Sequence, residues 1–105
     1  MVRHFGIDSD SFVRKDRKKK LVDIATKQFG GDRIIPLEPV RLSDGKEYSS
    51  CFGICDENGS LTIQVLTDFY VVFVTKQRSY DSAEKLANNI QSETGREPTL
   101  TEYYG

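Results

Sequence analysis

Apolar and polar residues alternate most regularly between residues 48 and 76, and this alternation predicts two β-hairpins that share a strand. The Asn58-Gly59 dipeptide suits a two-residue type I′ turn, because both central residues need positive φ and both tolerate it. That turn predicts four cross-strand pairs: Phe52 with Val65, Ile54 with Ile63, Cys55 with Thr62, and Glu57 with Ser60. Alternation then assigns one apolar set to the core face: Phe52, Ile54, Leu61, Ile63 and Val65.

The second hairpin uses the longest apolar run of the chain, residues 69–74. A two-residue loop at Thr67-Asp68 would pair Val65 with Tyr70. This register adds three residues to the core face: Tyr70, Val72 and Val74. It places a second apolar set on the opposite face: Leu66, Phe69, Val71 and Phe73. Thr-Asp is a poor type I′ pair, so a longer loop remains an alternative, and a slip of one residue would exchange the two faces.

Residues 33–42 are expected to be extended, but Pro36 and Pro39 would remove ladder hydrogen bonds from a central strand. This segment is therefore predicted to be an edge strand or partly a loop. Asp44-Gly45 favours another hairpin turn, which would pair Leu42 with Glu47 and Val40 with Ser49. The expected sheet is a four-stranded antiparallel meander in sequence order.

A first helix is expected to begin among residues 8–11, which are good N-cap types, and to end near Phe29 before Gly30-Gly31. Its apolar stripe consists of Leu21, Val22, Ala25 and Phe29, with Ile24 and Gln28 at the margin. The N-terminal half is charged on nearly all sides, so we expect its first two turns to project beyond the sheet edge or to lie on a rim. Before it, residues 4–7 fit either a short edge strand or a loose end.

A second helix is predicted after Ser79, with Asp81 and Glu84 forming a capping box and Gly95 ending the helix. Its apolar stripe is Ala83, Leu86, Ala87 and Ile90. Residues 99–105 fit a sheet-edge strand or a flexible tail. The chain is thus predicted to be one α+β domain over residues 1–105, in the order α-β-β-β-β-α, with loose ends at 1–10 and 97–105 as one alternative.

Charge is unevenly distributed along these 105 residues, although the net charge is only −1 and the pI is about 5.8. Residues 14–20 carry six positive side chains and one negative one, a net +5, so the rest of the chain sums to −6. A uniformly basic nucleic-acid-binding protein is therefore not indicated. No apolar run approaches the ~18 residues of a membrane-spanning helix, and no signal-peptide core is present, so we expect a cytoplasmic protein without membrane contact.

Motifs for catalysis, cofactors or metals are weak. On a strand, Cys51 and Cys55 would stand about 13 Å apart, too far for the ~7 Å that a disulfide requires, so two free thiols are expected. These thiols and His4 are too few for a usual zinc site. No catalytic residue, metal ligand or cofactor is assigned.

Three functional hypotheses follow, in decreasing order of support. The first is a non-enzymatic interaction module that presents a sheet face to a protein partner or to a second copy of itself, because one layer of helices covers only one face of a sheet. Its expected interface is Leu66, Phe69, Val71 and Phe73. The alternative is that the N-terminal segment and the C-terminal segment, residues 100–104, cover that face within one chain. The second is a nucleic-acid-binding or anion-binding module that uses the basic helix: Arg14, Lys15, Arg17, Lys18, Lys19 and Lys20. The third is a small enzyme.

Overall fold

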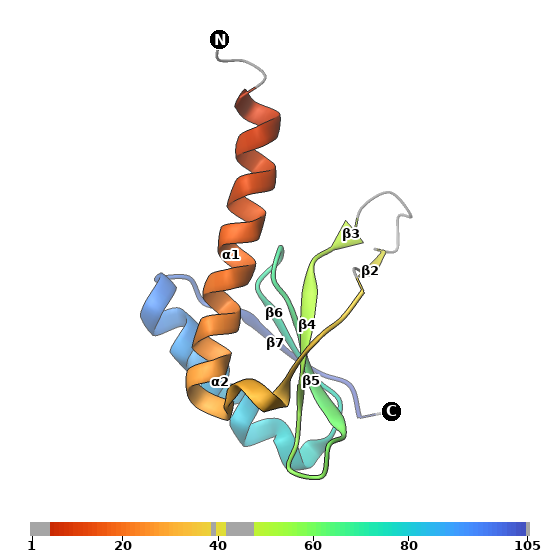
Figure 1. Cartoon of the computed structure of the whole chain (residues 1–105). Coiled ribbons are helices and arrows are strands. Elements are labelled where there is room, and N and C mark those ends of the chain that lie inside the picture. The colour runs from red at the N-terminus through yellow and green to blue at the C-terminus, as the bar shows by residue number, and fades with distance from the viewer. Residues whose placement is uncertain (1–4, 39, 42–47, 105) are drawn as a thin grey trace.

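The computed structural model describes residues 5–38, 40–41 and 48–104, which form a small α+β domain (Figure 1). Its helices are α1 (Phe5–Phe29) and α2 (Tyr80–Thr94), and single 3₁₀ turns lie at Gly31–Arg33 and Gln77–Ser79. The strands are β1 (Ile34–Pro36), β2 (Val40–Arg41), β3 (Tyr48–Ser49), β4 (Cys51–Cys55), β5 (Leu61–Leu66), β6 (Val71–Val74) and β7 (Thr99–Glu102).

Five strands form one mixed sheet in the order β1-β4-β5-β6-β7. The first four are antiparallel neighbours, as predicted, but β7 adds a fifth strand that runs parallel to β6. The four-stranded prediction is therefore corrected: α2 carries the chain back along the sheet, so the strand that follows it repeats the direction of β6. Backbone hydrogen bonds from Thr99 N to Tyr70 O (2.8 Å) and from Tyr103 N to Val74 O (2.9 Å) fix this strand, which confirms the sheet-edge alternative for this segment.

The predicted strand over residues 33–42 is divided between two sheets. Its first part is the edge strand β1, and its second part, β2, pairs with β3 in a separate two-stranded ribbon. Val40 pairs with Ser49 as predicted, whereas the expected pair of Leu42 and Glu47 lies outside the described residues.

The hairpin between β4 and β5 confirms two predicted pairs, Phe52 with Val65 and Ile54 with Ile63, but its turn differs from the prediction. Gly59 has φ of +83°, whereas Asn58 lacks the positive φ of a type I′ turn. The loop is one residue longer, with Asp56 N donating to Ser60 O (2.8 Å) and Gly59 N to Asp56 O (3.0 Å). The carboxylate Oδ1 of Asp56 accepts from Asn58 N (2.9 Å) and Ser60 N (3.0 Å), and this local bonding favours the longer loop.

A β-bulge next to this turn moves one predicted core residue to the opposite face. Cys55 pairs with Leu61 rather than with Thr62, so the alternation in β5 is interrupted. The Thr62 side chain is buried, and its Oγ1 accepts a hydrogen bond from Ser79 Oγ at 2.8 Å. Leu61 instead packs on the face of Gly53, where an added Cβ would lie 2.5 Å from Leu61 Cδ1. The placement of Leu61 in the core was therefore wrong.

The hairpin between β5 and β6 has a four-residue loop, residues 67–70, rather than the two-residue loop. Val65 pairs with Val72, so the expected pair of Val65 and Tyr70 was wrong. Because the register differs by two residues, the faces are preserved, and Val72 and Val74 are buried in the core. Tyr70 lies in the loop with φ of +51°, and its partly buried ring packs against the core cluster.

Helix α1 spans Phe5–Phe29, so the N-cap predicted among residues 8–11 was wrong, and the expected short strand is replaced by helix at residues 5–7. His4 lies outside the described residues. Its end at Phe29 is as predicted, and Gly30 has φ of +95°. The C-terminal half packs on the sheet through Leu21, Ile24 and Ala25, while the N-terminal half projects beyond the sheet (Figure 1).

The N-cap of helix α2 is Ser79, two residues before Asp81, so the predicted capping box at Asp81 was wrong. Since the chain is already helical at Tyr80, Asp81 lies inside the first turn of the helix. The Ser79 hydroxyl does not cap the helix, because it donates to Thr62 instead. The predicted apolar stripe is confirmed as buried: Ala83, Leu86, Ala87 and Ile90. Gly95 ends the helix at φ of +77°, as predicted.

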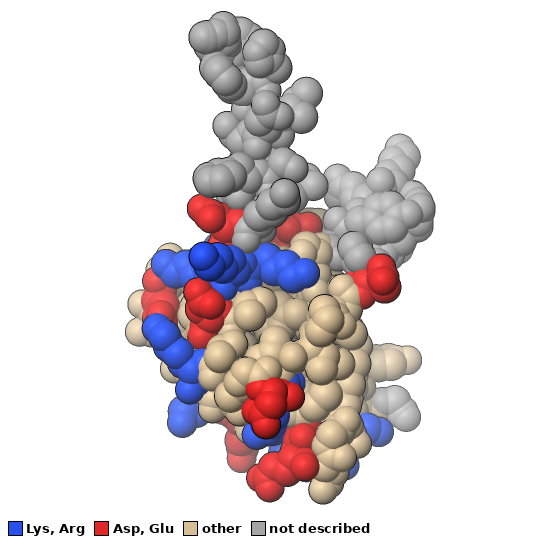
Figure 2. Space-filling view, viewed as in Figure 1, with Lys and Arg blue, Asp and Glu red and all other residues tan. Residues whose placement is uncertain are grey.

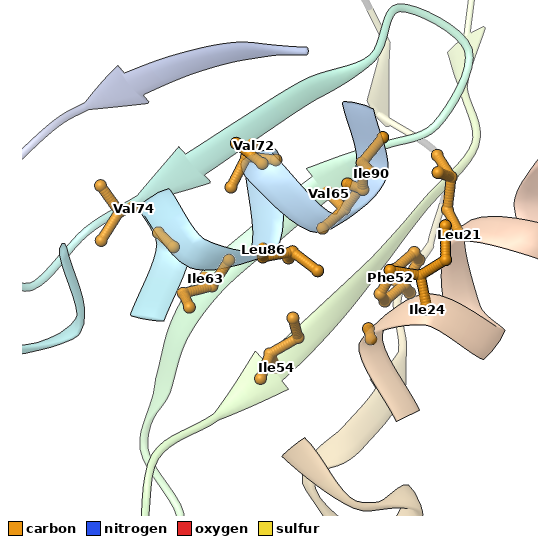
Figure 3. Packing of buried hydrophobic residues seen from close by; sticks show 13 residues of the cluster. Leu21, Ile24, Phe52, Ile54, Ile63, Val65, Val72, Val74, Leu86 and Ile90 are labelled. Atoms are coloured by element: carbon orange, nitrogen blue, oxygen red, sulfur yellow. The ribbon is translucent and has the colours of Figure 1, made fainter. Parts of the chain in front are cut away.

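Both helices pack on the same face of the sheet, and the core is the single layer between them and the strands (Figure 3). Leu86 and Ile90 of α2 and Leu21 and Ile24 of α1 meet a common set of buried strand residues: Phe52, Ile54, Ile63, Val65, Val72 and Val74. The helices also contact each other, since Gln28 donates to Ser82 O (3.0 Å) and accepts from Asn89 Nδ2 (2.9 Å). No helix in the described ranges is long and apolar enough to cross a membrane.

Replacing Gly53 with alanine should destabilise the fold by about 1 kcal/mol, because the new Cβ would overlap Leu61. Leu61→Ala removes the obstructing methyl groups, so the double variant should be more stable than the two separate costs predict. Gly31→Ala is the control, since its Cβ would meet only Thr26 at 3.8 Å. Urea unfolding at one fixed protein concentration gives the free energy of unfolding of each variant. If the losses of the two single variants simply add in the double variant, the contact between residue 53 and Leu61 is contradicted.

In acid, the free energy of unfolding should depend on whether the Asp56 carboxylate is ionised. The hydrogen bond from the Arg78 guanidinium (Nε to Oδ2, 2.8 Å), followed by the backbone bond from Ser60, holds the Asp56 pKa below its ordinary value of 3.8. The stabilisation is therefore complete above pH 3.8 and is lost as the pH falls through the folded-state pKa. Melting temperatures from about pH 6 to about pH 2.5 should show Asp56→Asn approaching wild type in acid. A constant difference between the two proteins would contradict this linkage.

Candidate functional site

The sheet face opposite the helices is apolar, and no described helix packs on it. We call this surface the open face, and it comprises Ile35, Leu37, Leu61, Gln64, Leu66, Val71, Phe73, Thr101 and Tyr103. Apart from the exposed Tyr103, these side chains are half-buried, and none of them is charged.

The middle of the open face is built by paired strands. Leu66 pairs with Val71, and Gln64 pairs with Phe73, so these side chains stand next to one another. The ring of Tyr103 meets Phe73 edge-on, with centroids 6.1 Å apart and an interplanar angle of 61°. Tyr103 itself is 66% exposed, which makes it a large aromatic group available for contact.

Three of the four residues predicted for a protein interface are therefore brought together: Leu66, Val71 and Phe73. The fourth, Phe69, lies in the loop between β5 and β6, where its side chain is 43% exposed. Tyr103 belongs to the C-terminal segment that was the alternative cover for this face, and the parallel pairing of β7 with β6 brings its ring beside Phe73. Sequence reasoning missed Leu61, because the bulge changes the face on which that side chain lies.

Both cysteines are free thiols in different environments. Cys51 is fully buried, its Sγ donates to Glu38 O at 3.2 Å, and burial raises its pKa. Cys55 is half-buried next to the bulge. Among the described residues, no group of three or more His, Cys, Asp and Glu side chains is placed to hold a metal ion.

The basic residues of α1 are not equivalent. Lys19 and Lys20 are exposed, whereas Arg17 and Lys18 are half-buried. Figure 2 shows Lys and Arg side chains gathered in a band across the middle of α1, with acidic side chains close by. Of the six predicted residues, Arg14 and Lys15 are placed in the helix by their backbone only, and their side chains lie outside the described part of the chain.

Arg17 reaches from α1 to the loop between β5 and β6. Its Nη1 donates to Asp68 O at 3.0 Å, and its guanidinium carbon lies 5.5 Å from the centroid of the Tyr70 ring. The Asp68 carboxylate is engaged separately, because Oδ2 accepts from Ser50 N at 3.1 Å. The arginine is therefore held at the point where the helix passes the end of the sheet.

A second arginine meets the same ring. The guanidinium carbon of Arg96, just after α2, lies 4.3 Å from the Tyr70 centroid. We call Arg17, Tyr70 and Arg96 the arginine–tyrosine cluster. Since both distances end at one centroid, the two guanidinium carbons are at most 9.8 Å apart, which is 4.3 and 5.5 Å combined. At that separation two positive charges repel by about 0.4 kcal/mol in bulk water.

Tyr70 is also under backbone strain. It is the one non-glycine residue with positive φ among those described, at +51°, a conformation that costs an ordinary residue about 1–3 kcal/mol. The hydrogen bond from Thr99 N to Tyr70 O helps to hold it there. The sequence carries no local signal for this cluster, because residues 17, 70 and 96 meet only in the folded chain.

Comparison of the chain with family models, with curated proteins and with solved structures finds no significant match.

In the native protein, a thiol reagent should label Cys55 much faster than Cys51, because Cys51 is fully buried and its raised pKa lowers the thiolate fraction. Quantitative labelling of Cys51→Ser and Cys55→Ser separates the two sites, and denaturant should expose both. Equal rates in the two native variants, or a mass two hydrogens lower that indicates a disulfide, would refute the arrangement.

Proposed function

We propose that the protein is a non-enzymatic interaction module that pairs with a second copy of itself through the open face. The observation that supports this most directly is that α1 and α2 cover the same face of the sheet. The strands therefore present a second apolar surface that the described helices do not bury. Contiguous apolar surfaces of this kind mark interaction sites on soluble proteins.

A second copy is the partner that the chemistry of the open face fits best. Its strand residues include no charged side chain, so two copies can approach without like-charge repulsion. A two-fold arrangement matches each apolar group with the same surface on the other copy. Two sheets packed face to face at about 10 Å would interdigitate Leu66, Val71 and Phe73 with their counterparts.

The size of the open face sets the expected strength of the dimer. Five strands about 4.8 Å apart span roughly 24 Å, and a five-residue strand spans roughly 17 Å, which gives a flat footprint of roughly 400 Å². Stable interfaces bury about 800 Å² per partner. Protruding side chains make the true contact area larger than the flat footprint, but it still falls short of a stable interface. The dimer should therefore be weak and should dissociate on dilution.

Static light scattering coupled to size exclusion should therefore give a mass that rises with concentration from one chain of 11.9 kDa towards two. Val71→Asp and Phe73→Asp should remain monomeric over the same range, because each would bury an unpaired carboxylate in the interface. Asn88→Asp, an exposed position on α2, adds the same charge away from the open face and should behave like wild type.

Methyl resonances provide a second measurement on the same samples. In the dimer, the Val71 methyl groups should be protected from a soluble paramagnetic probe as the concentration rises. A wild-type protein that stays monomeric at high concentration would overturn the proposal. Dimerisation that survives both aspartate substitutions would place the interface elsewhere and would overturn it as well.

A further inference from the structure

We infer that the arginine–tyrosine cluster, together with Lys19 and Lys20, binds the phosphate backbone of a nucleic acid. This site lies on α1 and at the end of the sheet, and it does not depend on self-association through the open face. It extends the basic stretch of the helix by two residues, Tyr70 and Arg96, that come from distant parts of the chain.

The chemistry of the guanidinium group suits this role. Stacking on an aromatic ring occupies the flat face of a guanidinium but leaves its in-plane N–H groups free to bind phosphate oxygens in pairs. Among the hydrogen bonds of the described residues, Arg17 uses one of its five donors, on Asp68 O. Within the described residues, Arg96 contacts the Tyr70 ring and has no carboxylate partner. Both arginines can therefore accept an anion without breaking an existing ion pair.

The two arginines are also held in place before any ligand arrives. Tyr70 is fixed by its loop and by β7, and Arg17 is tied to Asp68. An ordered arginine loses less conformational freedom on binding than a mobile one. Phosphates of one strand follow one another about every 3.4 Å along a duplex axis, so guanidinium groups at most 9.8 Å apart can contact the same strand.

The shape of the surface favours an extended ligand over a small molecule. The hollow beside Tyr70, about 440 Å³, is open to solvent and is lined by Asp16, Arg17, Lys19, Lys20, Asp23 and Tyr70. Pockets for small molecules enclose most of the ligand, which an open hollow does not. A polymer can instead lie across the hollow and contact Arg96 as well.

The charges lining the hollow make a sharp test possible. Three basic residues and two acidic ones give it a net +1, and Arg96 brings the site to +2. Asp16 and Asp23 should therefore oppose phosphate binding. If they do, removing their charges strengthens binding, an effect that a merely structural role for the basic residues would not produce.

Binding should be independent of base sequence, because phosphate contacts position a nucleic acid without reading it. Four contacts, from Arg17, Arg96, Lys19 and Lys20, predict a slope of about −3.6 for log affinity against log salt on duplex DNA, at about −0.9 per contact. Fluorescence anisotropy with labelled single-stranded and duplex probes of roughly 20 nucleotides measures this slope.

The following variants separate the contribution of this site to binding from the effect of the protein's net charge. Arg96→Ala should reduce the slope by about one, and Lys19→Glu with Lys20→Glu should remove detectable binding. Asp16→Asn with Asp23→Asn should increase affinity several-fold at low salt. Lys85→Glu, on the exposed side of α2, changes the charge equally away from the site and should have a smaller effect than one Glu substitution at Lys20. Circular dichroism confirms that each variant is folded.

Several results would overturn the inference. These are no binding of either probe at low salt, a Lys85→Glu effect equal to that of Lys20→Glu, or no gain from removing the two aspartates. Stronger binding to vesicles of anionic lipid than to nucleic acid would identify a membrane surface as the ligand instead. Phe73→Asp changes the open face three residues away from Tyr70, so loss of dimerisation and loss of nucleic-acid binding are separable outcomes.

Discussion

Burial of one sheet face beneath two helices is the interaction on which the rest of this structure depends. Every large core residue belongs to that layer: strand residues enter it with a period of two, and helix residues enter it at spacings of three and four. Leu86 of α2 and Leu21 of α1 are almost completely buried there. Losing either side chain would leave a cavity costing about 2–5 kcal/mol, a large share of the stability of a domain this small.

The position of α2 in this layer also determines what lies at its two ends. At its start, Ser79 donates to the buried hydroxyl of Thr62 and so connects the helix to the bulge in β5. At its end, Gly95 turns the chain so that Arg96 reaches Tyr70 and β7 can run parallel to β6. The arginine–tyrosine cluster and the Phe73–Tyr103 contact are thus consequences of how one helix is packed.

Local patterns in the sequence were sufficient for those features that local physics controls. Alternation identified the residues of β4 and β6 that enter the core, and glycines with positive φ marked the ends of α1 and α2. Features set by distant contacts were not predictable. The buried Thr62 hydroxyl at the bulge has its donor in the distant Ser79, and the parallel β7 depends on the path of α2. The same holds for the two candidate sites. Most of the open face could be predicted from strand alternation, whereas the arginine–tyrosine cluster could not, because Arg96 meets Tyr70 only in the folded chain.

The two proposed surfaces are compatible because they use opposite sides of one sheet. The open face is uncharged and suits close contact with its own copy, whereas the helical side carries the basic side chains and would repel it. In a two-fold dimer through the open face, the two arginine–tyrosine clusters would therefore remain on the outside. Each copy would then raise the effective concentration of the other's site along a nucleic acid, so a weak dimer and a weak phosphate site would reinforce each other.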